Sequence, residues 1–125
     1  MLIEHPESVV VVAVDGESLV AVSQRRPGSP EPTLELPAGK IEPGESPEQA
    51  AVRELGEECA LAAAKWRRLG SFWAAPAYST ELVHAFEARG LSPTGGEPEL
   101  DVTRVALDGD GLTEATSLAA VALRR

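Results

Sequence analysis

The chain has 125 residues and a mass of 13.1 kDa, enough for one compact domain with its own core but not for several. Its single cysteine, Cys59, excludes a disulfide framework and a zinc site built from several cysteines. Eleven Lys and Arg against twenty Asp and Glu give a formal net charge of −9, which disfavours a nucleic-acid partner.

The apolar segments are too short for a membrane span. The longest, residues 9–14, has six residues, and the N-terminal residues lack the basic segment of a signal peptide. A lone cysteine also fits a reducing compartment. We therefore expect a single domain over residues 1–125, located in the cytoplasm, with no membrane or nucleic-acid partner.

The first half of the chain contains a hairpin pattern followed by loops. Two apolar runs, residues 8–14 and 18–24, are separated by Asp15-Gly16, which predicts a β-hairpin. Residues 25–33 hold three prolines and a glycine and are expected to be a loop. The remaining predictions are a short strand at 33–36, a loop at 38–45, strands at 65–74, 80–88 and 100–107, a turn at 75–77, a loop at 91–97 and a closing helix at 112–124.

Between these segments, one stretch has a helical pattern. Ser46 is a good N-cap, Pro47 suits the first helical position, and Gln49 completes a capping box. The helix is expected to reach about Cys59. Together with the strands it predicts a mixed sheet with two helices, an α/β or α+β domain.

Three carboxylates share one side of this helix. At 100° per residue, Glu54, Glu57 and Glu58 fall within an arc of about 100°, beside the apolar face. Like charges at this spacing repel unless a cation offsets them. A solvated acidic face is the alternative interpretation. Glu45, just before the helix, and Arg53, on it, could form an ion pair that holds these acids in place.

The spacing of these residues resembles the signature of a known family. The segment reads Gly39, five residues, Glu45, seven residues, and then Arg53-Glu54-Leu55-Gly56-Glu57-Glu58-Cys59-Ala60-Leu61. It is similar to the Nudix box, G-x5-E-x7-R-E-U-x-E-E-x-G-U, where U is a bulky apolar residue. Every fixed position matches except Ala60, which stands where the family has glycine. Either Ala60 ends the helix in a left-handed conformation, or the helix continues through residues 60–63.

The resemblance implies a fold, an activity and a metal site. The fold is an α/β/α sandwich around a mixed sheet, and the activity is hydrolysis of nucleoside diphosphates linked to another moiety, with Mg²⁺ or Mn²⁺. The metal ligands would be Glu54, Glu57, Glu58 and the backbone carbonyl of Ala38, oriented by the pair named above. The general base would come from the loop at Glu97-Pro98-Glu99, with Glu97 as base and Glu99 as a further metal ligand, or with these roles exchanged. A solvated loop is the alternative.

Three segments outside the box resemble the ADP-ribose pyrophosphatase branch of the family. They are residues 34–39 (LELPAG), residues 24–26 (QRR) and residues 75–81 (APAYSTE), the last with Ala75 and Ala77 in place of the usual Ser and Gly. By this resemblance, the substrate-binding residues would be Arg25, Arg26, Glu35, Gly39, Pro76 and Tyr78.

The resemblance leaves several functions open. The substrate would be ADP-ribose or a related nucleoside diphosphate sugar, with nucleoside triphosphates or dinucleoside polyphosphates as the alternative. A non-catalytic nucleotide-binding module on the same fold is a third interpretation. The branch usually exchanges a longer N-terminal β region between subunits, whereas seven residues precede the first expected strand here. An exchanged dimer is therefore not expected, although a homodimer stays possible.

Overall fold

The valine-rich run near the N-terminus forms the centre of the sheet. In the computed structural model, which describes residues 1–124, this strand is β1 (Ser8–Asp15), and its apolar side chains are buried on both faces. Side chains of a strand point alternately to opposite faces. Val9 and Val11 therefore enter one core cluster, while Val10 and Val12 enter the other. An unbroken apolar run is typical of a strand covered on both faces.

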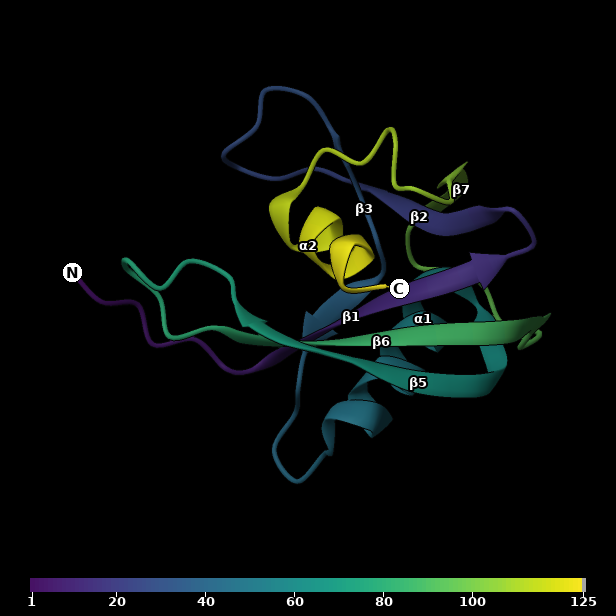
Figure 1. The fold of residues 1–125 in the computed structure, drawn as a ribbon, viewed down its shortest axis with the longest axis horizontal. Helices are drawn as coiled ribbons and strands as arrows, with labels where there is room; N and C mark the ends of the chain where they lie inside the picture. Colours follow the sequence, from purple (N-terminus) through teal and green to yellow (C-terminus); the bar gives the residue numbers. More distant parts are fainter. Residues whose placement is uncertain (125) are drawn as a thin grey trace.

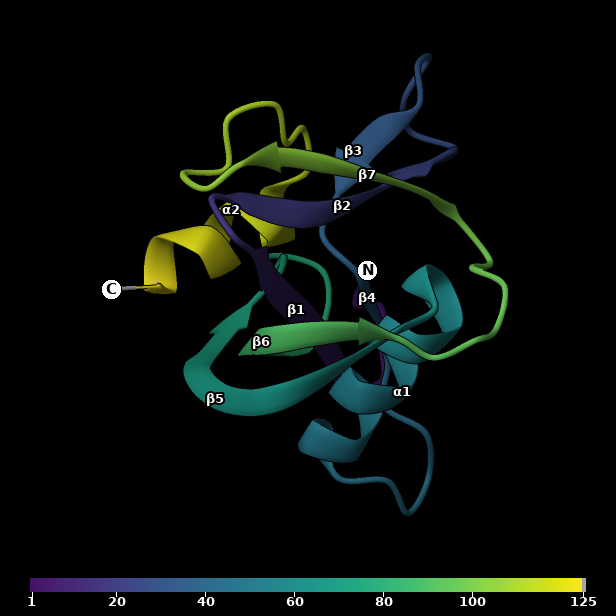
Figure 2. The same ribbon diagram turned by 90° about the vertical axis from the view of Figure 1, so that its right-hand side faces the viewer.

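The sheet around β1 has seven strands and is mixed (Figure 1). Its main path is β3-β2-β1-β6-β5, with β4 paired to β1 and β7 paired to β2; Figure 2 shows β7 alongside β2. Strands β1 and β6 are parallel, and every other pair is antiparallel. The other elements are β2 (Ser18–Gln24), β3 (Thr33–Glu35), β4 (Ala38–Lys40), α1 (Pro47–Cys59), β5 (Leu61–Trp73), β6 (Leu82–Pro93), β7 (Asp101–Ala106) and α2 (Ala115–Leu123).

One helix covers each face of the sheet. Ala51 and Leu55 of α1 pack in the cluster that contains Val9, and Ala120 of α2 packs in the cluster that contains Val10. In Figure 1 the two helices accordingly lie on opposite sides of β1 and β6. The predicted α/β/α sandwich is confirmed. Among the described residues, no helix has the length and apolar character needed to cross a membrane.

Several predicted boundaries were wrong. Strand β5 begins at Leu61 rather than at 65, and β6 extends to Pro93, into the segment expected to be a loop. The two strands pair along this whole length, from Leu61 opposite Pro93 to Trp73 opposite Leu82, with one irregularity. Strand β4 was expected to be loop, and α2 begins three residues later than predicted.

The end of α1 decides between the two predictions for Ala60. This residue has φ 56° and ψ 39°, the left-handed conformation, and its N–H donates to the carbonyl of Gly56 at 2.9 Å. The helix therefore ends here, and continuation through residues 60–63 is excluded. Ala60 is the only non-glycine residue with positive φ among residues 1–124.

Replacing Ala60 by glycine is expected to stabilise the protein by about 0.5–1 kcal/mol, because glycine adopts the left-handed conformation without steric strain. Urea denaturation measures the change. The matched control is Ala62→Gly, at an exposed position inside β5, where glycine is expected to lower stability. A less stable Ala60→Gly protein would contradict this account of the helix end.

The N-terminal segment pairs with the connection between β5 and β6. Ile3 donates its N–H to the carbonyl of Tyr78 at 2.6 Å and accepts from Thr80 at 3.0 Å, and the His5 N–H donates to the Thr80 hydroxyl at 2.8 Å. The two segments run side by side at the left of Figure 1. This arm, residues 1–5 and 74–81, projects beyond the sheet and holds Tyr78 largely exposed.

Candidate active site

The acidic side of α1 lies against the short strand β4. The capping box fixes the start of the helix: the Ser46 hydroxyl accepts from the Gln49 N–H at 3.1 Å, and the Gln49 side chain accepts from the Ser46 N–H at 2.9 Å. From this start, Glu54 and Glu58 fall next to the core and are about nine-tenths buried. Glu57 stays more exposed.

The backbone of β4 approaches both buried carboxylates closely. The Ala38 N–H donates to Oε1 of Glu58 at 3.0 Å. At Gly39, a Cβ atom would overlap the carboxylate of Glu54, so this position accommodates only glycine unless Glu54 moves. The sequence match at Gly39 therefore has a steric reason in this structure.

Burial of these carboxylates disfavours their charged forms. Desolvation raises the pKa of Glu58 to about 8, and the nearby Glu54 carboxylate adds to the effect. Desolvation also raises the pKa of Glu54, despite a hydrogen bond from Arg53. A divalent cation would add positive charge beside both groups, in addition to the guanidinium that already reaches Glu54.

Arg53 connects the loop before α1 to the acids on the helix, as predicted. Its Nε and Nη2 donate to the two carboxylate oxygens of Glu45 at 2.7 and 2.9 Å, and Nη2 also donates to the carbonyl of Lys40 at 2.9 Å. Its Nη1 donates to Glu54 at 2.7 Å and to Glu57 at 3.2 Å. The guanidinium lowers the pKa of Glu45 to about 2. A planar fork with several donors suits this role better than a lysine would.

The donor set fits a hard divalent cation, although the side chains do not yet converge on one point. Carboxylate and carbonyl oxygens are the ligands that Mg²⁺ and Mn²⁺ prefer. Across residues 1–124, no three His, Cys, Asp or Glu side chains form a ready-made metal cluster. One carboxylate oxygen of Glu54 and one of Glu57 accept hydrogen bonds from Nη1 of Arg53.

The loop that carries the predicted base lies against the last turn of α1. The Glu99 N–H donates to the carbonyl of Glu57 at 3.0 Å, and the Leu100 N–H donates to the carbonyl of Glu58 at 3.3 Å. The charge of Glu99 contributes to the raised pKa of Glu54. Glu99 is thus beside the acidic cluster, whereas Glu97 is exposed in the loop.

A cleft of about 500 Å³ opens next to this cluster. Arg26 and Glu35 line it and form a two-point ion pair, Nε to Oε2 at 2.9 Å and Nη2 to Oε1 at 2.8 Å. Glu35 is buried, and its hydrogen bonds raise the pKa of Arg26. The cleft residues are His5, Ser8, Val9, Val10, Gln24, Arg26, Glu35, Ala38, Gly39, Lys40, Glu58, Glu81, Val83, Glu114 and Thr116.

The cleft gathers only part of the predicted substrate site. Arg26, Glu35 and Gly39 line it, but Arg25 does not, and neither do Pro76 and Tyr78 of the arm. Of these two neighbours in the loop after β2, Arg26 is the one that pairs with the buried carboxylate of Glu35.

Glu114 is a cleft residue that the sequence analysis missed. It is the N-cap of α2 and accepts hydrogen bonds from the N–H groups of Thr116 and Ser117, both at 2.9 Å. The Ser117 hydroxyl donates to Glu114 at 2.7 Å and accepts from the Leu36 N–H at 2.8 Å, which ties α2 to the segment before Ala38. The only sequence signal was an acidic residue in front of the closing helix.

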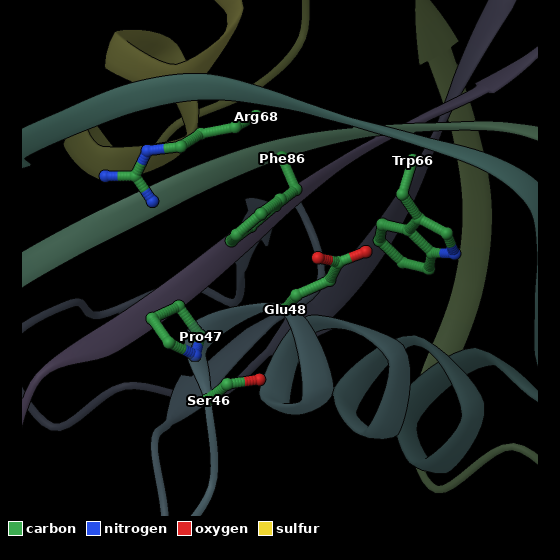
Figure 3. Close-up of a pocket in the computed structure, with 6 residues that line it drawn as sticks. All are labelled: Ser46, Pro47, Glu48, Trp66, Arg68 and Phe86. Atoms are coloured by element: carbon green, nitrogen blue, oxygen red, sulfur yellow. The ribbon is translucent and has the colours of Figure 1, made fainter.

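A second, smaller hollow of about 290 Å³ lies between the start of α1 and strands β5 and β6 (Figure 3). Trp66, Phe86 and Arg68 form its sheet side, and residues 46–48 form its helix side. Arg68 lies over the ring of Phe86, 5.9 Å from the centroid. None of the predicted site residues lines this hollow, whereas five of them, Arg26, Glu35, Ala38, Gly39 and Glu58, line the cleft.

The comparisons with known proteins agree with this geometry. A family model described as NUDIX domain matches residues 4–121. The chain belongs to the NUDIX domain family. The resemblance inferred from the box, and the fold that it implied, are confirmed.

Three known proteins illustrate what the chain is similar to. It is 40% identical to "ADP-ribose pyrophosphatase" of Bacillus subtilis and 37% identical to "Methanol dehydrogenase activator" of Bacillus methanolicus, in each case over 80% of this chain and 55% of the relative. A solved structure, "Crystal structure of ADP compounds hydrolase", superposes with a TM-score of 0.81 at 29% identity, covering 94% of this chain and 69% of that one. The chain spans about half the length of the two Bacillus relatives.

Proposed function

We propose that the chain is a metal-dependent NUDIX hydrolase that cleaves the pyrophosphate bond of nucleoside diphosphate derivatives, with ADP-ribose or a related nucleoside diphosphate sugar as substrate. The observation that carries the proposal is the pair of nearly buried carboxylates, Glu54 and Glu58, held against the backbone of β4 at the edge of the cleft. The names of two similar proteins, an ADP-ribose pyrophosphatase and an ADP compounds hydrolase, support the substrate class.

The proposed metal ligands are Glu54, Glu57, Glu58, Glu99 and the carbonyl of Ala38. When bound, Mg²⁺ or Mn²⁺ neutralises the charge of the pyrophosphate and lowers the pKa of a coordinated water. The ion pair of Glu45 and Arg53 orients these ligands from the loop side of the helix.

In the proposed reaction, water attacks one phosphorus of the diphosphate and the P–O bond to the bridging oxygen breaks. ADP-ribose and water then give AMP and ribose 5-phosphate. Glu97 accepts the proton of the attacking water, or Glu99 does so with the roles exchanged. Both side chains are exposed, and the backbone N–H of Glu99 donates to the carbonyl of Glu57 on α1. A base that closes onto bound substrate fits this arrangement.

The cleft would hold the rest of the substrate. Arg26, fixed by Glu35, offers guanidinium donors to a phosphate or sugar oxygen, and Gly39 lets the backbone approach the ligand. Arg25, Pro76 and Tyr78 would contact the part of the substrate that extends beyond the cleft. Pro76 and Tyr78 belong to the same arm as the cleft residues His5 and Glu81, and Arg25 lies in the chain between the cleft residues Gln24 and Arg26, which supports this placement.

We also propose that the enzyme is located in the cytoplasm. Burial raises the pKa of Cys59 to about 12 and keeps it an unreactive thiol, which is compatible with the reducing cytoplasm in which we place the enzyme.

A substrate panel tests the proposed function. Purified protein is incubated with ADP-ribose, other nucleoside diphosphate sugars, dNTPs and dinucleoside polyphosphates, each with Mg²⁺, with Mn²⁺ and with EDTA. We expect metal-dependent release of AMP from ADP-ribose. Faster turnover of dNTPs than of ADP-ribose would overturn the proposed substrate class. Binding of a compound without turnover of any would overturn the proposed hydrolase activity and favour a nucleotide-binding module. Glu97→Gln and Glu99→Gln then identify the base, since the variant that lacks the base loses the acidic limb of the pH–rate profile, where activity rises as the base loses its proton.

A further inference from the structure

Three arginines surround one buried carboxylate that does not line the cleft. Glu87 of β6 is 4% exposed, and it accepts hydrogen bonds from Nε of Arg67 at 3.3 Å, of Arg89 at 3.1 Å and of Arg124 at 2.7 Å. Although burial opposes it, the three guanidiniums together lower the pKa of Glu87 to about 2. Glu87 is therefore charged at neutral pH and fixes three cations around itself.

The three guanidiniums use only part of their hydrogen-bond donors on Glu87. Each reaches Glu87 through Nε, and among residues 1–124 no terminal Nη atom of the three has a hydrogen-bond partner. Arg67 and Arg89 are half exposed, at 54% and 50%. Their Nη groups are donors held at fixed places, which is the arrangement that recognises phosphate or carboxylate oxygens.

A fourth cation completes the cluster. Lys65 stands directly opposite Arg89 in the β5–β6 register and two residues before Arg67, so its side chain leaves the sheet on the same face. Like charges in directly opposed positions destabilise a sheet. In a chain with a net charge of −9, four of the eleven Lys and Arg lie in this one place, around a single carboxylate.

Anchoring Glu87 does not by itself require this arrangement. The short contact from Arg124, at the end of α2, already links the helix to the sheet. Arg67 and Arg89 share the other carboxylate oxygen at longer distances and direct net positive charge to the surface. The cluster therefore carries more positive than negative charge, and an external anion would neutralise the excess.

We propose that Lys65, Arg67, Arg89 and Arg124 form a binding site for the phosphate group of a small anion, distinct from the catalytic cleft. The two sites lie at opposite ends of α2: Thr116, near the first residue of the helix, lines the cleft, whereas Arg124, just after its last residue, belongs to the arginine cluster. The inference goes beyond the proposed function and stands without it.

Titration of the metal-free protein tests the site. In EDTA the α1 carboxylates hold no cation, so they offer nothing to an anion. Inorganic pyrophosphate and AMP are each added at constant ionic strength, while the arginine Nε–H and backbone amide NMR signals are followed. We expect saturable shifts of the Arg67 and Arg89 signals. Shifts with pyrophosphate alone assign the site to free inorganic anions, and shifts with both extend it to nucleotide phosphates; either result supports it.

Variants make the test specific. Arg67→Gln and Arg89→Gln are each expected to weaken binding roughly tenfold or more. Arg104→Gln is the matched control, because Arg104 is a partly exposed arginine outside the cluster whose Nε donates to Asp15 at 2.8 Å and whose Nη1 donates to the carbonyl of Thr103 at 3.2 Å. Amide signals outside the cluster report whether each variant is folded. If Arg67→Gln does not fold, Arg67→Lys replaces it, because lysine keeps the positive charge but lacks the planar set of guanidinium donors. Absence of saturable shifts overturns the proposal, and so does equal weakening by Arg104→Gln.

Discussion

Replacing Glu58 by glutamine is expected to lower kcat for ADP-ribose on the order of 10²–10³-fold. Glutamine keeps the size of the side chain but removes a negative oxygen from the proposed metal ligands. The matched control is Glu48→Gln, which makes the same chemical change at an exposed position of the same helix and is expected to leave kcat unchanged. A Glu58→Gln enzyme with near wild-type turnover would contradict the role of this carboxylate.

The same variant is expected to change how stability depends on pH. The pKa of Glu58 is raised from 4.5 to about 8 by burial, so between these values the unfolded chain has released a proton that the folded protein keeps. The free energy of unfolding of the metal-free protein should therefore fall as pH rises from 4.5 to 8. The lowered pKa values of Glu45 and Glu87 act below this window.

Urea denaturation in EDTA at several pH values between 4.5 and 8 measures this effect. Glu58→Gln should flatten the decline and be more stable than the wild type at pH 8, because it buries no charge there. Loss of activity together with a gain in stability is the combination expected of a functional acid. An unchanged pH slope in Glu58→Gln would show that Glu58 ionises normally.

Gly39→Ala is expected to lower kcat on the order of 10²-fold with little loss of stability. The new Cβ would overlap the carboxylate of Glu54, and this carboxylate, at the end of a flexible side chain, would have to move away from β4. Steady-state kinetics and thermal unfolding of the same samples separate the two effects.

Gly28→Ala is the matched control for this change. Gly28 lies in the loop after β2 with no atom within 4 Å of an added Cβ and without a positive φ, so both activity and stability should be retained. Full activity of Gly39→Ala would contradict the proposed position of Glu54, and global unfolding would show that Gly39 supports the fold instead.

Local patterns predicted much of this structure. The capping box at Ser46, the Asp15-Gly16 turn and the acidic stripe on α1 depend on residues a few positions apart, and each is present. The contact of Arg53 with Glu45 was predicted for the same reason, because a loop and the helix that follows it remain neighbours in space.

Long-range pairing explains what was missed. Residues 62–64 are alanines with high helix propensity, but they pair with residues 90–92 and extend the β5–β6 ribbon. Strand β4 has three residues and exists through its pairing with β1. Glu114 reaches the cleft because α2 docks onto the sheet, and no local pattern encodes that docking.

The central claim is that the carboxylates of α1 bind a divalent cation, and titration with Mn²⁺ followed by electron paramagnetic resonance tests it most directly. The account predicts saturable Mn²⁺ binding by the wild type, weakened roughly tenfold or more in Glu54→Gln and Glu58→Gln and unchanged in Glu48→Gln. A wild-type protein that takes up no Mn²⁺, or a Glu58→Gln protein that binds it as tightly as the wild type, would contradict the account.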